Sequence, residues 1–577
     1  MEEIREEIER VVGEIFQVEE KVEMMKAPEN TGADFSTNVA MKLAGKLHKN
    51  PMEIAEEIVN ELRRETSPAP FYIEVAAPGF INFISSDEYI WGKVGGFWEN
   101  GEFSEKNISN MIYSGKKVVV EFSDPNPFKV LHVGHFYTSV VGDAMARMIE
   151  RAGGEVKRVN FGGDVGLHVA KTIFALREAG ISAEELTIEK IAECYVLGSR
   201  AYEEDEAAKN EIVKLNKEIY QEGEKNEIYR RGREISYQYF KDFYRKIGVE
   251  FDRFYPESEV AGTGVSKVQE GLRLGVYEKS DGAVIFPGEK YGLHTRVFIN
   301  KEGLPTYETK DVGLIFRKNE DYHFDRSIVI TGNDIVEYMK VVLKSVSMIP
   351  GGKELAEKTT HITHGNVKLP GHEKMSSRKG NFIKAEEVLK ETCDKLDGNL
   401  ALAIAAIKYA FLKYKVGRDF DFDIDESVSM TGNSGVYLLY TVVRAKKILS
   451  DDGQGEARPR HASRRPVVTG GARYCSIVSS SMSRTGFPPL FSVYEKALAK
   501  KLGEWGGVVE RGVRELAPSE ICKYLFELSQ EFSRFYENCK VRGDEREELR
   551  LVLVATYYNI MISGLKLIGI EDIPEEM

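Results

Sequence analysis

The sequence predicts an α/β protein of several domains, built around a doubly wound parallel sheet and followed by an all-α part. Three observations predict this fold class. The apolar run KKVVVEFS, from Lys116, is typical of a strand buried on both faces of a parallel sheet. A loop, a helix starting near Gly134 and the run VKRVNFGG follow in strand–helix–strand order. After about residue 395 the pattern is helical.

Size and composition favour a globular protein in a reducing cytoplasm. The 577 residues are too many for one ordinary core, and 42% hydrophobic with 30% charged residues is usual. No stretch approaches the ~18 uninterrupted apolar residues of a membrane span. The acidic, helix-patterned start MEEIREEIERVVGEIF is not a secretion signal. Five separated cysteines without a CxxC pair argue against a zinc knuckle or a disulfide framework. A net charge of −13 argues against non-specific coating of nucleic acid, although it permits a local basic groove.

Three domains are expected. Residues 1–108 resemble a small α/β unit, with helices over 2–16 and 51–65 and a strand–turn–strand in FYIEVAAPGFINFI. Residues 109–395 hold the parallel sheet, interrupted by a charged helical insertion at about 183–250. Residues 396–577 are helical, and one helix carries an apolar stripe of Ile521, Leu525, Leu528, Phe532 and Phe535.

Residues 451–489 have no period and are rich in Ser, Gly, Pro and Arg. One interpretation is a flexible connection. Another is an RNA contact through Arg458, Arg460, Arg464 and Arg465. A third is a corrupted reading of the gene.

The sequence HVGH, from His132 to His135, stands where a strand leads through a loop into a helix. A helix start offers unpaired N–H groups and partial positive charge, which is typical of a phosphate site. Gly134 permits close backbone approach, and the two histidines can hydrogen-bond phosphate oxygens. The alternative is a pair of histidines that cap a helix.

A second candidate motif is HEKMSSRKGNFI, residues 372–383. Lys374 and Lys379 bracket Ser376 and Ser377, so this loop can fold over a triphosphate. The alternative is a solvated basic turn. The two motifs, in this order and a domain apart, are more specific than either alone.

HVGH and KMSSR resemble the two signature motifs of class I aminoacyl-tRNA synthetases, and within that class the chain resembles arginyl-tRNA synthetase. The resemblance rests on VEFSDPNPFKVLHVGH, NFGGDVGLH, YPES, PTYETKDVGL, KMSSRKGN and TGNSGVYLLYTVVRAKKI. GADFSTNVAMKLA and AAPGFINF resemble that family's N-terminal domain, and LKLIGIEDIPEEM resembles its C-terminus. It implies a Rossmann-like catalytic core, a tRNA D-loop-binding N-terminal domain and an anticodon-binding helical domain. It covers nearly all of the chain except 451–489.

The resemblance implies a two-step reaction. The carboxylate of L-arginine attacks the α-phosphate of ATP, and the arginyl group then passes to the 3′ end of tRNA(Arg), which releases AMP and pyrophosphate. Positioning and charge stabilisation do this work without a protein nucleophile. Mg²⁺ is expected with ATP, held by phosphates and water rather than by a protein metal site. The family further implies a cytoplasmic monomer whose first step needs bound tRNA.

The resemblance also assigns residues to ATP. Those expected to act in catalysis are His132, His135, Lys129, Lys374 and Lys379. Those expected to bind ATP are Lys129, His132, Gly134, His135, Lys374, Met375, Ser376 and Ser377. Ser377 stands where the usual second motif has a lysine, so Lys129, Arg378 and Lys379 are the candidates for the cation that faces pyrophosphate.

Arginine recognition requires carboxylates, because a guanidinium has five donors and a fixed charge. Glu121 ends the first strand beside the expected ligand crevice, and Asp311 follows Tyr307 by four residues, on one helix face. By resemblance, Glu121, Ser123 and Asn126 surround the α-amino group, whereas Tyr307 and Asp311 contact the guanidinium. The alternative makes Asp311 a helix cap and Tyr307 a core residue.

Contacts with RNA are expected from aromatic side chains, on which unstacked bases rest. By resemblance, the anticodon candidates are Tyr437, Tyr440, Tyr536 and Met577, and the D-loop candidates are Phe80 and Asn82. The alternative for the anticodon candidates is a place in the helix core, and the alternative for Phe80 is the core of the small domain.

The chain departs from the family at three positions near the site. The family's usual Gly-Asp-Trp-Gly is Gly163-Asp164-Val165-Gly166 here, and a common glutamine is replaced by His168. A glutamine often found near the substrate is replaced by Ile335.

Rival hypotheses stay open at this point. They are another class I synthetase (for glutamate, cysteine or lysine), a small-molecule nucleotidyltransferase with an HxGH motif, and an RNA-binding protein without catalysis. An acidic pocket argues against glutamate as the substrate.

Overall fold

The chain divides into two compact units. The computed structural model describes residues 2–28, 31–65, 71–99, 102–105, 112–368, 383–450 and 491–577. The first unit comprises Met1–Asn107, Ala445–Trp505 and Gln530–Ile560, and the second comprises Ile108–Arg444, Gly506–Ser529 and Met561–Met577.

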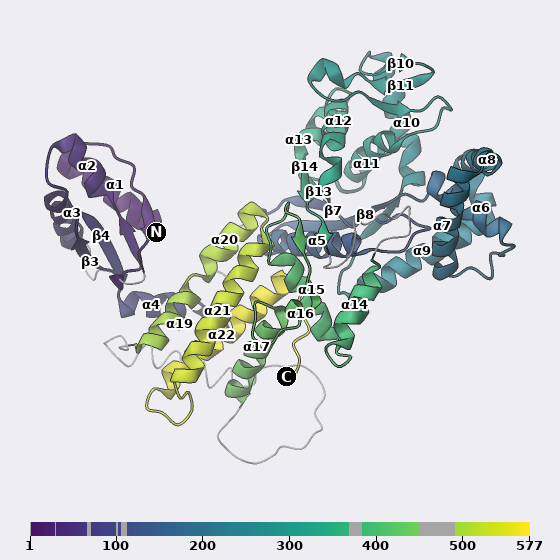
Figure 1. The fold of residues 1–577 in the computed structure, drawn as a ribbon. Helices are drawn as coiled ribbons and strands as arrows, with labels where there is room; N and C mark the ends of the chain where they lie inside the picture. Colours follow the sequence, from purple (N-terminus) through teal and green to yellow (C-terminus); the bar gives the residue numbers. More distant parts are fainter. Residues whose placement is uncertain are drawn as a thin grey trace. The chain divides into compact units, whose positions relative to one another are not determined.

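A five-stranded parallel sheet organises the second unit, in the order β14-β13-β7-β8-β9 (Figure 1). The strands are β7 (Lys117–Glu121), β8 (Glu155–Gly162), β9 (Arg253–Pro256), β13 (Arg326–Gly332) and β14 (Thr359–His364). The chain starts at the middle strand, runs outward through β8 and β9, and returns to the other side through β13. This order confirms the doubly wound prediction. It also creates a switch point between β7 and β13, whose carboxyl ends border the usual ligand crevice of such sheets.

Helices connect these strands. α5 (Val133–Arg151) joins β7 to β8 and begins near Gly134, as predicted. Four helices lie between β8 and β9. α6 (Leu167–Glu178) precedes the insertion expected at about 183–250, and α7 (Ile188–Glu204), α8 (Glu206–Glu222) and α9 (Glu227–Lys246) lie within it. Figure 1 shows α6, α7 and α8 grouped together beyond α9.

The segment that leads to β13 carries its own small sheet. α10 (Glu257–Arg273) is followed by the antiparallel strands β10 (Glu278–Ser280), β11 (Ala283–Phe286) and β12 (Arg296–Ile299), and then by α11 (Tyr307–Tyr322). α12 (Val336–Ser347) and α13 (Gly352–Lys358) lie between β13 and β14.

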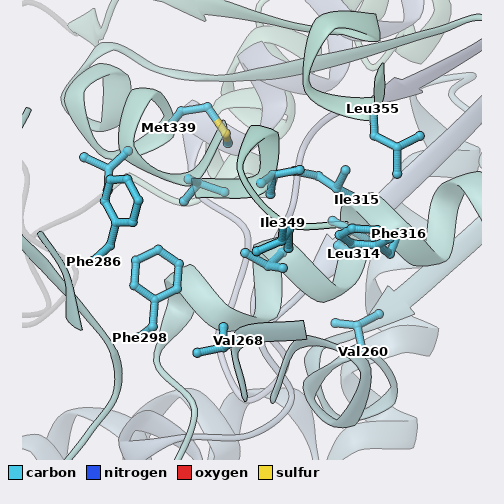
Figure 2. Packing of buried hydrophobic residues seen from close by; sticks show 14 of the residues in the cluster. Val260, Val268, Phe286, Phe298, Leu314, Ile315, Phe316, Met339, Ile349 and Leu355 are labelled. Atoms are coloured by element: carbon cyan, nitrogen blue, oxygen red, sulfur yellow. The ribbon is translucent and has the colours of Figure 1, made fainter. Parts of the chain in front are cut away.

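One hydrophobic cluster ties this segment to the parallel sheet. It includes Val119 of β7 and Val159 of β8, both almost fully buried. Figure 2 shows Leu314, Ile315 and Phe316 of α11 within the same cluster, which also includes Phe286 and Phe298 of the small sheet. The apolar run of α11 therefore fixes that helix against the edge where ligands are expected.

The remainder of the second unit is mainly helical. It contains α14 (Ala385–Asp394), α15 (Leu400–Leu412), α16 (Ile424–Ser427) and the short strands β15 (Val367–Lys368) and β16 (Phe420–Asp421). α17 (Gly435–Ser450), α21 (Pro518–Asn538) and α22 (Glu547–Leu567) each pass from one unit into the other, and α20 (Trp505–Glu515) begins at their boundary. The five residues of the predicted apolar stripe on α21 are all fully buried.

The first unit begins with a small α/β fold. Its sheet has the order β1-β2-β4-β3, formed by β1 (Met24–Lys26), β2 (Phe35–Thr37), β3 (Phe71–Ala76) and β4 (Phe80–Ser85). The predicted helices are α1 (Glu2–Phe16) and α3 (Pro51–Glu65), and the predicted hairpin is β3–β4. The sequence analysis missed α2 (Val39–Leu47) and the two short strands before it.

The first unit continues with α4 (Asp87–Gly95), β5 (Trp98–Glu99), β6 (Glu102–Phe103) and α19 (Val493–Gly503). The three hypotheses for 451–489 fall outside the described residues. Among the residues that the structure describes, no helix combines the length and apolar character that crossing a membrane requires.

We predict that Gly264→Ala destabilises the protein by about 1–3 kcal/mol, because α10 and α11 touch through bare backbone at this position. A Cβ on Gly264 would lie 2.0 Å from the carbonyl oxygen of Thr309. The measurement is urea unfolding of the full chain. Gly262→Ala, two residues earlier on α10 with nothing within 4 Å of the new Cβ, is the matched control. Equal stability of the two variants would contradict this packing.

Candidate functional site

The loop between β7 and α5 holds three non-glycine residues in left-handed backbone conformations. They are Ser123 (φ 76°), Asp124 (φ 49°) and Phe128 (φ 64°). Such residues cost about 1–2 kcal/mol each and persist only where their surroundings hold them. Here Oγ of Ser123 lies 2.7 Å from the hydroxyl oxygen of Tyr244, and Oδ1 of Asp124 accepts a 2.8 Å hydrogen bond from the Phe161 N–H. These contacts therefore hold the loop in one conformation at the switch point.

The two histidines cap α5 reciprocally. Nδ1 of His132 accepts hydrogen bonds from the backbone N–H groups of Gly134 (3.1 Å) and His135 (3.4 Å). Nδ1 of His135 accepts the N–H of His132 in return, at 3.2 Å. The two rings stack with centroids 3.7 Å apart. The two histidines of HVGH therefore cap the helix, as the alternative interpretation of this motif predicted.

The structure contradicts the expectation that the start of α5 offers unpaired N–H groups to a phosphate. The N–H groups of Gly134 and His135 are bound by His132, and the N–H of Val133 donates to the carbonyl of Ile383, so they are not the unpaired donors that the sequence suggested. Gly134 also has a different role. A Cβ there would lie 2.9 Å from Cε1 of His132, so glycine lets the imidazole fold over the helix start.

The capping fixes the chemistry of the imidazoles. Because each Nδ1 accepts a hydrogen bond, each neutral ring carries its proton on Nε2. Burial, followed by the charge of Lys129, lowers the pKa of His132 to about 4. Burial, His132 and Lys129 lower the pKa of His135 well below its usual range. Both rings are therefore neutral Nε2–H donors near pH 7.

A cavity of about 150 Å³ lies beside these rings. It is lined by Asn126, Lys129, Val130, His132, His135, Ala192, Tyr195 and Val196. The Lys129 ammonium lies 4.9 Å from the ring centroid of Tyr195 on α7. The lining thus combines a cation with imidazole donors, which suits an anionic group.

The second motif cannot be placed against this cavity. Lys374, Met375, Ser376, Ser377, Arg378 and Lys379 lie outside the described residues. The described chain resumes at Ile383, whose carbonyl accepts the N–H of Val133 at the start of α5.

The first turns of α11 present two of the predicted substrate residues on one helix. Tyr307 is its first residue and is 57% exposed, which excludes the core alternative. Asp311 lies one turn on and is partly buried, whereas the cap position belongs to Thr306. Burial raises the pKa of Asp311 to about 8, and the charges of Glu121 and Glu257 add to the rise. Among the described residues Asp311 has no ion pair, so its ionised form has no direct basic partner.

Glu121 differs from Asp311 in this respect. It ends β7 as predicted, but Nζ of Lys318 on α11 donates to its Oε2. Both side chains are almost fully buried, and Lys318 also donates to Oγ of Ser327 at 3.1 Å. Glu121 is therefore already neutralised through one oxygen.

Asn126 belongs to a second tightly packed region at the end of β8. Its Oδ1 accepts the N–H of Gly163 at 2.9 Å, and a Cβ on Gly163 would lie 2.4 Å from that same oxygen. Glu257 lies beside them and forms a buried ion pair with Lys310, at 2.5 Å. These contacts set the amide of Asn126 at the carboxyl edge of the sheet.

The residues that differ from the family have structural partners here. Val165 is buried in the hydrophobic cluster of α6 to α9. Nε2 of His168 lies 2.7 Å from the carbonyl oxygen of Gly163. Asp164 accepts hydrogen bonds from the backbone N–H and the hydroxyl of Ser258, at 2.9 and 2.6 Å. Ile335 ends a single 3-10 turn after β13.

Sequence reasoning missed Lys318, Tyr338 and Asp124. Lys318 follows Asp311 by seven residues and therefore lies on the same face of the helix. Its place after the apolar run VGLIF was the sequence signal that could have identified it. Tyr338 of α12 donates its hydroxyl to Oδ2 of Asp311, and no local pattern announces that contact. Burial and the charge of Glu121 raise the pKa of Asp124 well above its usual range.

The candidate RNA contacts are dispersed. In the second unit, the Tyr437 hydroxyl donates to the Ser529 carbonyl at 3.3 Å, and the Arg444 guanidinium lies 4.5 Å from the Tyr440 ring centroid. Met577 is 37% exposed.

In the first unit, Tyr536 is 40% exposed and Phe80 is partly buried. Asn82 is buried in the middle of β4, paired with both β2 and β3, so its side chain is not available to RNA.

Comparison with known families covers most of the chain. The family model for the catalytic domain of class I tRNA synthetases (R) matches residues 103–403. The arginyl tRNA synthetase N-terminal domain matches residues 2–84, and the DALR anticodon binding domain matches residues 467–577.

Full-length relatives agree with these matches. The chain is 28% identical to an arginine–tRNA ligase of Clostridium perfringens over 590 residues, which covers 98% of this chain and 97% of that protein. It is 25% identical to that of Treponema pallidum over 591 residues, with 96% and 94% covered.

Solved structures share the fold. The Thermus thermophilus arginyl-tRNA synthetase superposes with a TM-score of 0.73 at 23% identity, covering 100% of both chains. The Plasmodium falciparum arginyl-tRNA synthetase gives a TM-score of 0.75 at 18% identity, covering 100% of this chain and 99% of that one.

We predict that Gly134→Ala lowers the free energy of unfolding by about 1 kcal/mol, because the new Cβ displaces the His132 ring and removes the cap. Urea unfolding measures this change. His132→Asn keeps a capping oxygen without an imidazole, and we expect it to unfold like the parent. A parent-like Gly134→Ala would show that His132 does not cap α5.

Proposed function

The chain belongs to the arginyl-tRNA synthetase family of class I tRNA synthetases, and from this premise we propose how its residues share the reaction. The protein is an arginine–tRNA ligase, and its family uses ATP. We assign the three domains to residues 1–108, 109–395 and 396–577. The matched N-terminal and anticodon-binding domains leave no support for a small-molecule nucleotidyltransferase.

The proposed ATP site is the cavity at the start of α5. Lys129 supplies positive charge, and His132 and His135 donate their Nε2–H groups to the oxygens of the triphosphate. Because these rings stay neutral, they stabilise developing charge without losing a proton. We assign Lys374, Met375, Ser376, Ser377 and Lys379 to the same phosphates by their motif alone.

Mg²⁺ would accompany ATP. Phosphates and water would provide its ligands, because Mg²⁺ usually keeps several waters and binds together with substrate phosphates. When bound, the ion would spread the negative charge of the phosphates.

The proposed arginine site lies at the switch point between β7 and β13. The observation that carries it is Asp311, a partly buried carboxyl without a basic partner among the described residues, set on the ligand edge of the sheet. The guanidinium of arginine would supply the positively charged partner that this carboxyl lacks within the protein. Tyr307 lies one turn away, and we place Ser123, Asn126 and the remaining oxygen of Glu121 around the α-amino group.

We place tRNA(Arg) on both end domains. Tyr437, Tyr440, Tyr536 and Met577 would meet the anticodon loop, and Phe80 the D-loop. Asn82 is left out of this assignment because it is buried. The protein is proposed to act as a monomer in the cytoplasm. The decisive test is ATP–pyrophosphate exchange with every amino acid, with and without tRNA: only arginine should support exchange.

We predict that Asp311→Ala reduces arginine binding by at least about 100-fold, because it removes a charge-assisted hydrogen bond in a partly buried site. ATP binding should stay within about twofold of the parent. Calorimetric titration with each ligand measures both. Glu320→Ala, an exposed residue on the same helix, is the control. Parent-like binding by Asp311→Ala would refute the assignment.

Arginine binding should depend on pH. The pKa of Asp311 is raised to about 8, and a bound guanidinium favours the ionised carboxylate, so the ligand must displace a proton at pH 7. We expect affinity to rise between pH 6 and pH 8, by up to about tenfold per unit, and to level above it. Titration in buffers of different ionisation enthalpy should show proton release. No release at pH 7 would contradict the charge state.

We predict that Tyr437→Ala weakens tRNA binding by about 5- to 100-fold, because it removes the stacking of one base on an aromatic ring. Tyr437→Phe keeps the ring and should bind tRNA like the parent. Filter binding measures the tRNA, and unchanged arginine affinity verifies the fold. An unchanged tRNA dissociation constant for the alanine variant would exclude Tyr437 from the interface.

A further inference from the structure

A network of side chains stands behind the carboxyl of Asp311. The Tyr338 hydroxyl donates a hydrogen bond to its Oδ2. The guanidinium of Arg296 lies 5.2 Å from the centroid of the Tyr338 ring, and its Nη1 lies 3.2 Å from Oε1 of Glu308. Arg296 comes from β12, Glu308 and Asp311 from α11, and Tyr338 from α12. Three elements therefore meet at one carboxyl.

The network divides the two oxygens of Asp311 between protein and ligand. Oδ2 is held by Tyr338. Oδ1 accepts no hydrogen bond from the residues that the structure describes. A carboxylate can accept on both oxygens, so Oδ1 is the one that remains for a donor on the substrate.

The position of Tyr338 is set by packing. Its ring packs against the hydrophobic cluster that joins α11 and α12, next to the buried Met339 in the chain. The Arg296 guanidinium lies near one side of the ring. A ring held in this way gives its hydroxyl a fixed direction before substrate arrives, as preorganised donors require.

We propose that Tyr338 is a positioning and specificity-determining residue of the arginine site. By donating to Oδ2 of Asp311, it favours the ionised, hydrogen-bond-accepting form of that carboxyl, so the site favours a guanidinium over the isosteric neutral ureido group. This inference rests on the proposed function, in which Asp311 binds the guanidinium.

The chemistry of the two ligands makes this selection depend on one proton. L-citrulline carries a carbonyl oxygen where L-arginine carries a nitrogen donor. An ionised carboxylate forms a charge-assisted hydrogen bond with the guanidinium, whereas the neutral ureido group offers it only uncharged N–H donors. A protonated carboxyl loses this charge pairing with arginine and can donate to the ureido carbonyl oxygen of citrulline. Burial and the nearby charges of Glu121 and Glu257 raise the pKa of Asp311, and the Tyr338 hydrogen bond lowers it. Loss of the hydroxyl therefore favours the form that tolerates citrulline.

The experiment is calorimetric titration of the full-length parent and Tyr338→Phe with L-arginine and with L-citrulline, from pH 6 to pH 9. We expect arginine affinity of the variant to fall about 10-fold at pH 7 and to recover as the pH is raised, because one unit of pKa corresponds to a tenfold change. The preference for arginine over citrulline should fall about 10-fold at pH 7.

Tyr255→Phe is the matched control. The Tyr255 hydroxyl donates to Oδ2 of Asp321 at 2.6 Å, which is the same kind of hydrogen bond on the same helix. Ten residues of helix place Asp321 about 15 Å from Asp311. This control should match the parent in arginine affinity, pH dependence and discrimination.

Two results would overturn the inference. One is a Tyr338→Phe variant that equals the parent in all three measurements. The other is equal loss of both ligands at every pH, which would mean a purely structural role. A parent that fails to bind L-arginine at any pH would instead overturn the proposed function, so the two failures are distinguishable.

Discussion

The buried ion pair between Lys318 and Glu121 fixes α11 against the central strand of the sheet, and the proposed arginine site depends on it. It joins α11 to the end of β7, and neither side chain is more than 4% exposed. Breaking such a pair by removing one partner costs about 3–5 kcal/mol, because the other charge is left buried. Asp311 lies two turns from Lys318 on the same face of α11. Its position at the switch point therefore follows from this pair and from the apolar packing of α11.

The acidic residues around the site differ in whether they have a cation. Glu121 is paired with Lys318, Glu257 with Lys310 and Glu308 with Arg296. Among the described residues, Asp311 accepts a hydrogen bond only from the hydroxyl of Tyr338, and Asp124 only from the backbone N–H of Phe161. Uncompensated charge in a partly buried position is unfavourable until a ligand supplies the opposite charge. In the proposed arginine site, the guanidinium of the substrate would supply this opposite charge.

His132 and His135 each combine a structural role, capping α5, with a proposed chemical role, donating hydrogen bonds to phosphate. Each imidazole uses Nδ1 to satisfy backbone N–H groups at the start of α5, and this directs its proton to Nε2. Burial keeps both rings neutral. The capping interpretation and the phosphate interpretation of HVGH are therefore compatible, because they use different nitrogens. Gly134 is required by the cap, since a Cβ would meet the His132 ring.

The sequence by itself determined the elements whose signals are local. The apolar run of β7, the start of α5 near Gly134 and the stripe of α21 follow from hydrophobic periodicity and turn chemistry within about twenty residues. It also indicated Asp311 and Tyr307 as neighbours, because residues four apart share a helix face. Only the tertiary structure decided which carboxyl keeps an uncompensated charge. Lys318 and Tyr338 reach their acidic partners across 197 and 27 residues of chain. Pairings over such separations are selected by how packed elements meet, and no local pattern encodes them.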